Sequence, residues 1–278
     1  MNILKIAAFT DNNKGGNPAG VVICDEMPKE EEMLRIAKQV GYSETAFLKP
    51  FKDGWKIRYF SPELEIPFCG HATIASGAAL GNHFGDGVYK LFLNNKDEIS
   101  VDVTKSVNDR YIAALQSPET WSDIAPQEYV EEILEKFQLS TTKINPNFPV
   151  RFAFAGAKHL IIVLKDRKTL AEMNYDFEKT KALMLKEDIA TISLLWIESD
   201  GVFHSRNAFA SGGVYEDPAT GAAAAALGGY LRDIGWQGEK RFEIIQGEDM
   251  GTPSRLFVEY TSKSGESVKV AGETRYIN

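Results

Sequence analysis

The segment IPFCGHATIASG, residues 66–77, places a cysteine and a histidine two positions apart at the predicted start of a helix of small side chains. A thiol beside a helix N-terminus has a lowered pKa, so Cys69 could act as a nucleophile or a proton acceptor. The alternative is a small buried residue, which is the commoner role of a free cysteine. His71 could hydrogen-bond a substrate or relay a proton, although a lone histidine is more often structural.

Two carboxylates are further candidates for chemistry. Asp217 precedes Pro218 at the start of a second segment of small residues. An Asp–Pro pair is an expected helix start, yet a carboxylate there would also face any ligand bound at that helix end. Glu44, in GYSETAFL, has apolar neighbours in the sequence. Burial would raise its pKa so that it could act as a base and then as an acid, whereas a glutamate at a strand end is more often solvated.

The sequence predicts neither a metal nor a cofactor. It contains no C-x-x-C, H-E-x-x-H, Walker A or G-x-G-x-x-G pattern. The other histidines lack metal-ligand spacing with His71 or with one another; they are His83, His159 and His204. Two cysteines in a chain of 278 residues do not make a disulfide framework, so we expect the reducing cytoplasm as its location.

Composition and charge exclude several classes of partner. A net charge of −8 argues against nucleic-acid binding, which needs clustered Lys and Arg. No run approaches the roughly 20 apolar residues of a membrane span. The N-terminal MNILKIAAFTDNN is too short and too interrupted for a signal peptide and is typical of a first strand. We therefore expect no nucleic-acid partner and no membrane span.

An internal repeat links the two small-residue segments. Residues 66–85 and 218–231 contain no Asp, Glu, Lys or Arg. At an offset of 151 they share seven identities over the sixteen positions 65–80, of which four are Ala or Gly. Glu-x-Pro-x-x-Gly recurs at the start of both segments. The repeat predicts an internal duplication.

A helix without a polar face must be buried on all sides, which predicts the fold class. Short runs that alternate apolar and polar residues indicate half-buried antiparallel strands, and amphipathic helices are expected at 29–40, 126–137 and 177–185. We predict an α+β fold of two pseudo-symmetric halves, each a barrel-like antiparallel sheet around a central helix. The N-terminal half covers 1–117 with its helix near 70–81, and the C-terminal half covers 118–278 with its helix near 220–232.

The two central helices should present equivalent N-termini, and two details stay open at this point. Facing helix N-termini make a site for a carboxylate or an oxyanion, because their N–H groups are unpaired and carry partial positive charge. The alternative is that both helices are packing elements with capped ends. The final run, residues 267–276, could pair with either half.

Several motifs together resemble the PhzF-like family. The motifs are FTD at 9–11 with GNPAG at 16–20, SETAF at 43–47, RYFSP at 58–62 with CGHAT at 69–73, and EDPATG at 216–221. They span nearly the whole chain in the expected order. This family is named for the phenazine-biosynthesis isomerase and is related in fold to diaminopimelate epimerase and proline racemase. The resemblance implies cofactor-free isomerase chemistry on a small carboxylate in the cleft between two halves, usually in a homodimer.

The resemblance also implies roles for individual residues. Glu44 of SETAF would be the proton shuttle, while His71 and Asp217 would hold and polarise the substrate. Further substrate contacts would come from the same motifs, namely Asn17, Gly70, Thr73, Gly221 and Ala222. The family commonly has serine where this chain has Ala222, and a lost hydroxyl removes a hydrogen bond worth about 1 kcal/mol. Thr252, where many members have arginine, points the same way, and a different small carboxylate, or a family member with little activity, would fit.

Two other functions compete with the isomerase. The first is a non-catalytic small-carboxylate binding protein on the same scaffold. The second is a racemase that uses Cys69, but two-thiol racemisation needs a symmetric second thiol, and the repeat places Thr220 at that position. In the leading interpretation Cys69 is a packed residue at the helix start, and the base is Glu44.

Overall fold

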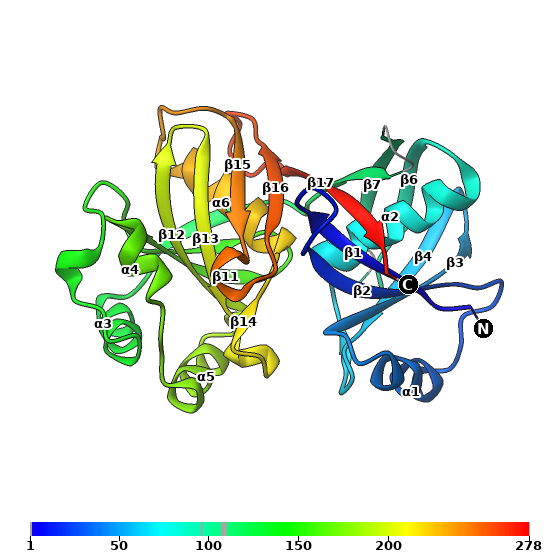
Figure 1. Ribbon diagram of the computed structural model, residues 1–278, viewed down its shortest axis with the longest axis horizontal. Helices are drawn as coiled ribbons and strands as arrows, with labels where there is room; N and C mark the ends of the chain where they lie inside the picture. Colours follow the sequence, from blue (N-terminus) through cyan, green and yellow to red (C-terminus); the bar gives the residue numbers. More distant parts are fainter. Residues whose placement is uncertain (1, 96, 107–109, 278) are drawn as a thin grey trace.

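The computed structural model describes residues 2–95, 97–106 and 110–277. Figure 1 shows two lobes side by side, with the last strand, β17 (Lys269–Tyr276), running between them. One lobe contains the helices α1 (Glu30–Val40) and α2 (Gly70–Phe84). The other contains α3 (Gln127–Lys136), α4 (Arg167–Ala171), α5 (Phe177–Lys186) and α6 (Gly221–Asp233).

The first lobe is a ring of strands around α2. Its strands are β1 (Leu4–Thr10), β2 (Asn17–Ile23), β3 (Glu44–Phe51), β4 (Gly54–Phe60), β5 (Glu65–Ile66), β6 (Gly87–Phe92), β7 (Glu98–Lys105) and β8 (Tyr111–Gln116). Pairing runs in the order β1, β2, β3, β4, β6, β7 and β8. β8 then pairs with β17, which pairs with β1, so the ladder returns to its start.

The second lobe repeats this order of pairing around α6. Its strands are β9 (Trp121–Ile124), β10 (Arg151–Phe154), β11 (Lys158–Leu164), β12 (Thr191–Ser199), β13 (Val202–Ala208), β14 (Glu216–Asp217), β15 (Arg241–Gln246) and β16 (Ser254–Glu259). They pair in the order β9, β10, β11, β12, β13, β15 and β16. β16 pairs with β17, so the last strand joins strands of both lobes.

The sheet is mixed, and the expectation of antiparallel sheets was wrong in this respect. Among the described strands, the parallel pairs are β2 with β3, β4 with β6, β11 with β12, and β13 with β15. Each of these pairs is joined through at least one helix, as parallel strands require a crossover connection. An alternating pattern of burial cannot distinguish the two directions, because it reports only which face of a strand is buried.

The small residues of α2 let the ring close around it. A Cβ atom on Gly77 would lie 2.6 Å from the side chain of Val101, and one on Gly81 would lie 2.6 Å from that of Val103. All residues of α2 from Gly70 to Gly81 are buried. The absence of a polar face in the sequence is therefore a direct consequence of a helix enclosed by strands.

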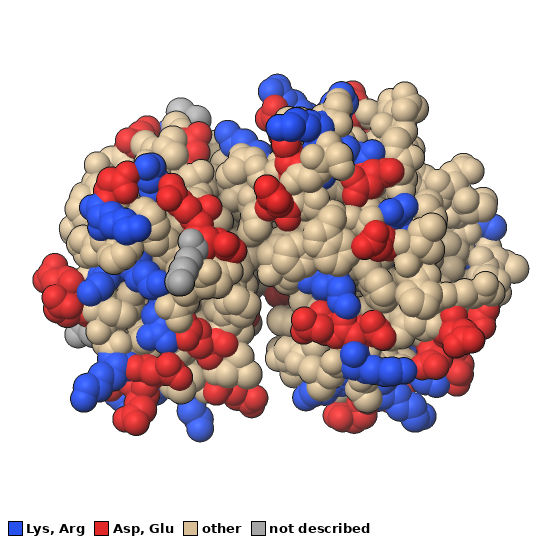
Figure 2. All heavy atoms as spheres, turned by 180° about the vertical axis from the view of Figure 1, so that it is seen from behind, with Lys and Arg blue, Asp and Glu red and all other residues tan. Residues whose placement is uncertain are grey.

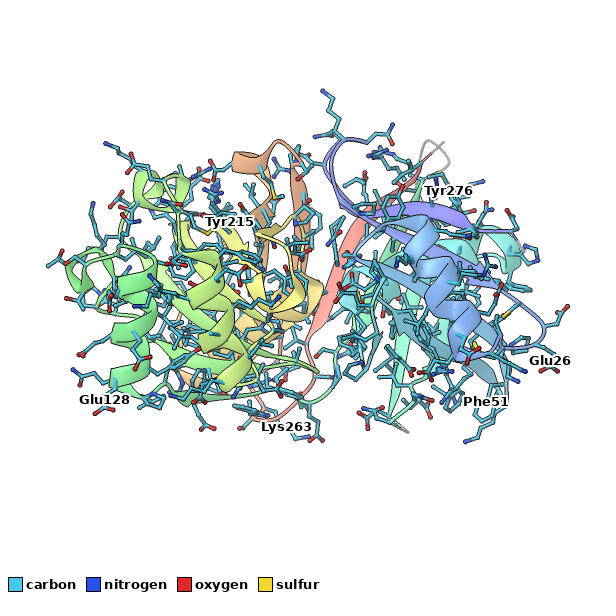
Figure 3. The ribbon with its side chains drawn as sticks, turned by 90° about the horizontal axis from the view of Figure 1, so that it is seen from below. Glu26, Phe51, Glu128, Tyr215, Lys263 and Tyr276 are labelled. Carbon is cyan, nitrogen blue, oxygen red and sulfur yellow. The ribbon has the colours of Figure 1, made fainter. Side chains whose placement is uncertain are left out.

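The core is shared between the lobes. One hydrophobic cluster extends from Ile6 and Leu80 in the first lobe to Leu227 and Val258 in the second. Two smaller clusters lie under α3 and α5, and under α1. Figure 3 shows α1 on the outside of one lobe and the green helices on the outside of the other. Within the described part of the chain, no helix combines the length and apolar character of a membrane span.

Candidate active site

The N-termini of α2 and α6 meet between the lobes. A Cβ atom on Gly70 would lie 2.9 Å from the backbone nitrogen of Ala222 and 3.0 Å from Cα of Gly221, so this approach requires glycine. Within the described residues, the N-cap residues Cys69 and Thr220 provide no side-chain cap for their helices. The first-turn N–H groups and the positive ends of two helix dipoles therefore converge, which is an arrangement suited to an anion.

Two equivalent ion pairs hold the segments that lead into these helices. Arg58 forms a bidentate pair with Glu65, donating from Nε to one carboxylate oxygen at 2.8 Å and from Nη2 to the other. Arg206 forms the same bidentate pair with Glu216, with an Nε–oxygen distance of 3.0 Å. The two glutamates are the repeated Glu of Glu-x-Pro. Their pairing explains the repeat, because each fixes the two-residue strand that precedes a helix start.

Glu44 is the first residue of β3 and points into the region of these helix ends. It is 6% exposed, and its Oε2 lies 3.2 Å from Nε2 of His71. The two atoms are at ion-pair distance but are not aligned for a hydrogen bond, and Oε2 has no hydrogen-bond partner among the described residues. Burial raises the pKa of the carboxyl, while hydrogen bonds from Ser43 and Cys69 oppose the shift. The group is thus an under-satisfied buried carboxyl beside an imidazole.

His71 and Asp217 are joined through Asn17. Nδ2 of Asn17 lies 2.8 Å from Oδ1 of Asp217, 3.0 Å from the carbonyl oxygen of Ala219 and 3.2 Å from Nδ1 of His71. Burial lowers the pKa of His71 against the opposing charge of Asp217, so the ring is neutral at physiological pH. Asn17 therefore connects a side chain of the first lobe to one of the second.

Asp217 is held by residues of its own lobe as well. The Thr220 hydroxyl donates to its Oδ2, and Gln246 donates from Nε2 to its backbone oxygen at 2.7 Å. Burial raises the pKa of Asp217 to about 6, against the opposing effect of His71. Gln246, which belongs to a Gln-Gly pair that continues the family pattern in the sequence, is a positioning residue whose partners lie 26 and 29 positions away in the chain.

The pKa of the Cys69 thiol does not follow the rule that a helix N-terminus lowers the pKa of a nearby thiol. Its Sγ lies 3.4 Å from Nδ1 of His71, and it is 7% exposed. Burial raises the pKa of the thiol well above its ordinary value, and the charge of Glu44 raises it further. Hydrogen bonds from nearby backbone N–H groups oppose this but are the smaller effect. The expectation of a lowered pKa was therefore wrong, because burial outweighs the helix N-terminus.

The structure brings most of the predicted site residues together, but Thr73 differs. Its hydroxyl donates to the carbonyl oxygen of Cys69 at 2.7 Å and lies 2.6 Å from the Tyr59 hydroxyl, so the side chain belongs to the interior of the first lobe. The histidines outside α2 have other partners: His159 contacts Thr191, and His204 lies between Glu198 and Glu248.

Two hollows of the molecule's surface bear on the location of the site. Figure 2 shows a notch between the two lobes on one side of the molecule. A surface cavity of about 360 Å³ lies elsewhere, over β15, β16 and β17, and is lined by residues that include Phe257 and Ala271. None of the predicted site residues lines that cavity, and Glu44, His71 and Asp217 are buried.

Comparison with known sequences gives matches over nearly the whole chain. The model of the family described as phenazine biosynthesis-like protein (PhzC-PhzF) matches residues 6–277. An uncharacterized isomerase of Clostridium acetobutylicum is 30% identical over 283 residues, which cover 97% of this chain and 93% of that protein. The trans-2,3-dihydro-3-hydroxyanthranilate isomerase of Pseudomonas chlororaphis is 28% identical over 270 residues, which cover 95% of this chain and 92% of that protein.

Comparison with solved structures shows the same fold. A phenazine biosynthesis protein of the PhzF family from Bacillus anthracis superposes with a TM-score of 0.83 at 23% identity, covering 99% of this chain and 96% of its own. A hydroxyproline epimerase from Agrobacterium vitis superposes with a TM-score of 0.67 at 12% identity, covering 99% and 89%. The fold is thus shared with epimerases at very low sequence identity.

Proposed function

The chain belongs to the phenazine biosynthesis-like protein family and is an isomerase, and from this premise we propose that Glu44 moves a proton on a small carboxylate bound between the lobes. One observation carries the proposal. A buried carboxyl, one oxygen of which has no hydrogen-bond partner in the described part of the chain, lies 3.2 Å from a neutral imidazole, next to two converging helix N-termini. No cofactor is needed for a proton transfer of this kind.

Each part of the site has a distinct task in this mechanism. The Glu44 carboxylate removes a proton from a carbon of the substrate and returns it to another carbon, with the double bond shifting between them. A raised pKa suits both steps, because the group must accept and then release the proton near neutral pH. First-turn N–H groups of α2 and α6 stabilise the negative charge that develops on the substrate. His71, Asn17 and Asp217 fix its orientation.

The substrate we propose is a small carboxylate other than a hydroxyanthranilate. Ala222 lies in the first turn of α6, beside Gly70, and is 8% exposed. It provides no hydroxyl where the family commonly has serine, so one substrate hydrogen bond of about 1 kcal/mol is missing. Of the other residues carried over from the family, we assign Gly70 and Gly221 to the close approach of the two helices.

The architecture and assembly complete the proposal. We propose that residues 1–117 and 118–278 are pseudo-symmetric, barrel-like halves that arose by duplication, a view supported by the same order of pairing around α2 and α6. We propose a homodimer on the basis of the family resemblance, and a cytoplasmic location because two cysteines do not make a disulfide framework. Light scattering on the purified protein would give twice the mass of 30.9 kDa, and a single-chain mass would contradict the dimer.

A second candidate function uses the same site without turnover. The missing hydroxyl at Ala222 favours a protein that binds a small carboxylate and does not transform it. The two functions differ in their dependence on Glu44. Carboxylate binding, measured as a thermal shift, would survive Glu44→Gln in a binding protein, whereas an isomerase loses its turnover.

Deuterium incorporation tests the isomerase directly. Wild type and Glu44→Gln are incubated in heavy water with a metabolite extract, and small acids are followed by mass spectrometry. We expect one acid to gain deuterium or change its retention with wild type only. Glu63→Gln, the same substitution at an exposed glutamate, is the matched control and should behave as wild type. Full activity of Glu44→Gln would refute the assignment.

A further inference from the structure

Three side chains of different chemistry converge at the start of α2. The carboxylate of Glu44, the thiol of Cys69 and the imidazole of His71 each offer one atom, and these atoms lie within 4.8 Å of one another. All three residues are more than nine-tenths buried. The proton-transfer mechanism uses Glu44 and His71 but leaves the thiol without a task.

The spacing of these atoms fits a tetrahedral metal ion. Zn–S bonds of about 2.3 Å and Zn–N and Zn–O bonds of about 2.0–2.2 Å imply separations of roughly 3.3–3.6 Å between ligand atoms. The observed separations are 3.2 Å from Glu44 Oε2 to His71 Nε2 and 3.9 Å from Cys69 Sγ to the same nitrogen. The third separation, between the Glu44 oxygen and Cys69 Sγ, is within 4.8 Å, so the three side chains would draw together around the ion and leave a fourth position open.

The charges also fit. A carboxylate and a thiolate together balance the two positive charges of a divalent ion, so the buried complex carries no net charge. A thiolate ligand selects soft ions such as Zn²⁺ over Mg²⁺ and Ca²⁺, which prefer oxygen. Glu44 Oε2, which has no hydrogen-bond partner among the described residues, would acquire one ligand bond to the ion.

We propose that Glu44, Cys69 and His71 form a binding site for a thiophilic divalent cation such as Zn²⁺, and that the bound ion inhibits the enzyme. On binding, the thiol releases its proton to solvent, and the imidazole binds the ion through Nε2 and carries its proton on Nδ1. The Glu44 carboxylate then coordinates the ion and is no longer free to accept the substrate proton. Ion binding does not depend on the isomerase mechanism, but the inhibitory role rests on it.

Asn17 makes the two states mutually exclusive. Its Nδ2 group faces Nδ1 of His71 and also donates to Asp217. A proton on Nδ1 would require the amide to turn its oxygen toward the ring, and the hydrogen bond to Asp217 would be lost. The arrangement that holds the substrate and the arrangement that holds the ion therefore differ at Asn17, and the ion should compete with substrate.

Cobalt spectroscopy of the purified full chain tests the site without any activity assay. Co²⁺ is titrated into wild type in the absence of added thiols and chelators. We expect one ion per chain, a thiolate-to-cobalt charge-transfer band in the near ultraviolet and the strong visible bands of four-coordinate Co²⁺. Zn²⁺ should displace the cobalt, and Mg²⁺ should not.

Cysteine variants assign the band. Cys69→Ser should lose the charge-transfer band and bind at least tenfold more weakly. Cys24→Ser should keep both, because Cys24 lies beside Leu48, at the other end of the β2–β3 ladder from Glu44. Cys69→Ala serves as a second variant if the serine form fails to fold, as judged by circular dichroism. The site is refuted if wild type shows no such band, or if the band persists without Cys69.

Inhibition is measured separately, on the isomerase activity found by deuterium incorporation. Zn²⁺ should inhibit wild type in competition with substrate. To reduce turnover by the same fraction of its own uninhibited rate, Cys69→Ala should need at least tenfold more Zn²⁺ than wild type. Cobalt bands in a protein without turnover would overturn the isomerase and the inhibitory role but support the ion site. Turnover unaffected by bound Zn²⁺ would overturn the inhibitory role alone.

Discussion

The two lobes share an order of strand pairing but differ at the position of the proposed base. In the parallel ladder of β2 and β3, Ala19 pairs with Glu44, and in the equivalent ladder of β11 and β12, His159 pairs with Thr191. Glu44 and Thr191 are the first residues of their strands. The first lobe therefore has a carboxyl group where the second lobe has a neutral hydroxyl.

Glu44 and Thr191 also differ in their hydrogen-bond partners. Thr191 lies 2.8 Å from Nδ1 of the buried His159, so its hydroxyl is satisfied, whereas Oε2 of Glu44 has no hydrogen-bond partner among the described residues. In the internal repeat, Ala222 of the second lobe corresponds to His71 of the first lobe. In the proposed mechanism the first lobe holds an acid–base pair, whereas the equivalent position of the second lobe holds a structural contact. A single base of this kind would suit movement of a proton between two positions on one face of a substrate.

The largest expected effect comes from removing the base. Glu44→Gln should lower turnover by about 10²- to 10⁴-fold, which is the usual contribution of a general acid–base group. Thr191→Val, the matched change in the second lobe, removes a hydrogen bond and should lower stability by about 1 kcal/mol without loss of turnover. Deuterium incorporation and urea denaturation measure the two effects. Equal losses of turnover in both variants would break the comparison.

The two Arg–Glu pairs give the next largest effect. The side chains of Arg206 and Glu216 are 10% and 4% exposed, and those of Arg58 and Glu65 are 16% and 22% exposed. Arg206→Ala leaves a buried carboxylate unpaired and should lower the free energy of unfolding by about 3–5 kcal/mol. Arg58→Ala should lower it by about 1 kcal/mol, because water can solvate Glu65. Similar midpoints of urea denaturation for both variants would show that burial does not distinguish the pairs.

Acidification should lower the stability of the protein through His159, a buried histidine of the second lobe. Burial lowers the pKa of His159 to about 3, from an ordinary value near 6.5. Between these values the unfolded chain binds more protons than the folded chain, so stability falls as the pH falls below about 6.5. The loss is about 1.4 kcal/mol for each pH unit and amounts to about 2 kcal/mol at pH 5.

Urea denaturation of wild type and His159→Gln between pH 7.5 and pH 5 isolates this contribution, because all other titrating groups are common to both proteins. The stability of wild type should fall more steeply. Parallel curves would mean that His159 is protonated in the folded protein. Such a result would remove the contrast between a neutral structural pair in the second lobe and a titrating pair in the first.

The sequence predicted the parts of the fold that depend on local pattern. The two central helices follow from segments without charged residues, since such helices must be enclosed. The repeated Glu-x-Pro follows from the ion pairs that hold it. The parallel pairing of β2 with β3, or of β11 with β12, could not be predicted from alternation, because alternation is the same in both directions.

The site was only partly predictable, because its members are distant in the sequence. The apolar neighbours of Glu44 made it one candidate among several, and only the family resemblance selected it. Its contacts with Cys69 and His71 depend on β3 passing the start of α2, which no local pattern reveals. Helix-terminus rules alone gave the wrong direction for the pKa of Cys69, since they do not include the depth of burial.

The smallest expected effect is a change in ligand affinity at Ala222, the residue that corresponds to His71 in the internal repeat. Ala222→Ser returns a hydroxyl to the first turn of α6 without a large change in volume. If the missing hydroxyl determines the choice of substrate, this variant should bind hydroxyl- or amino-bearing small carboxylates about fivefold more tightly than wild type, corresponding to one added hydrogen bond of about 1 kcal/mol. Thermal shift over a panel of carboxylates measures the change, with Ala222→Gly as the variant that gains no hydroxyl. An equal response of the serine and glycine variants would mean that position 222 only packs against Gly70, and that the selectivity of the site depends on the first lobe alone.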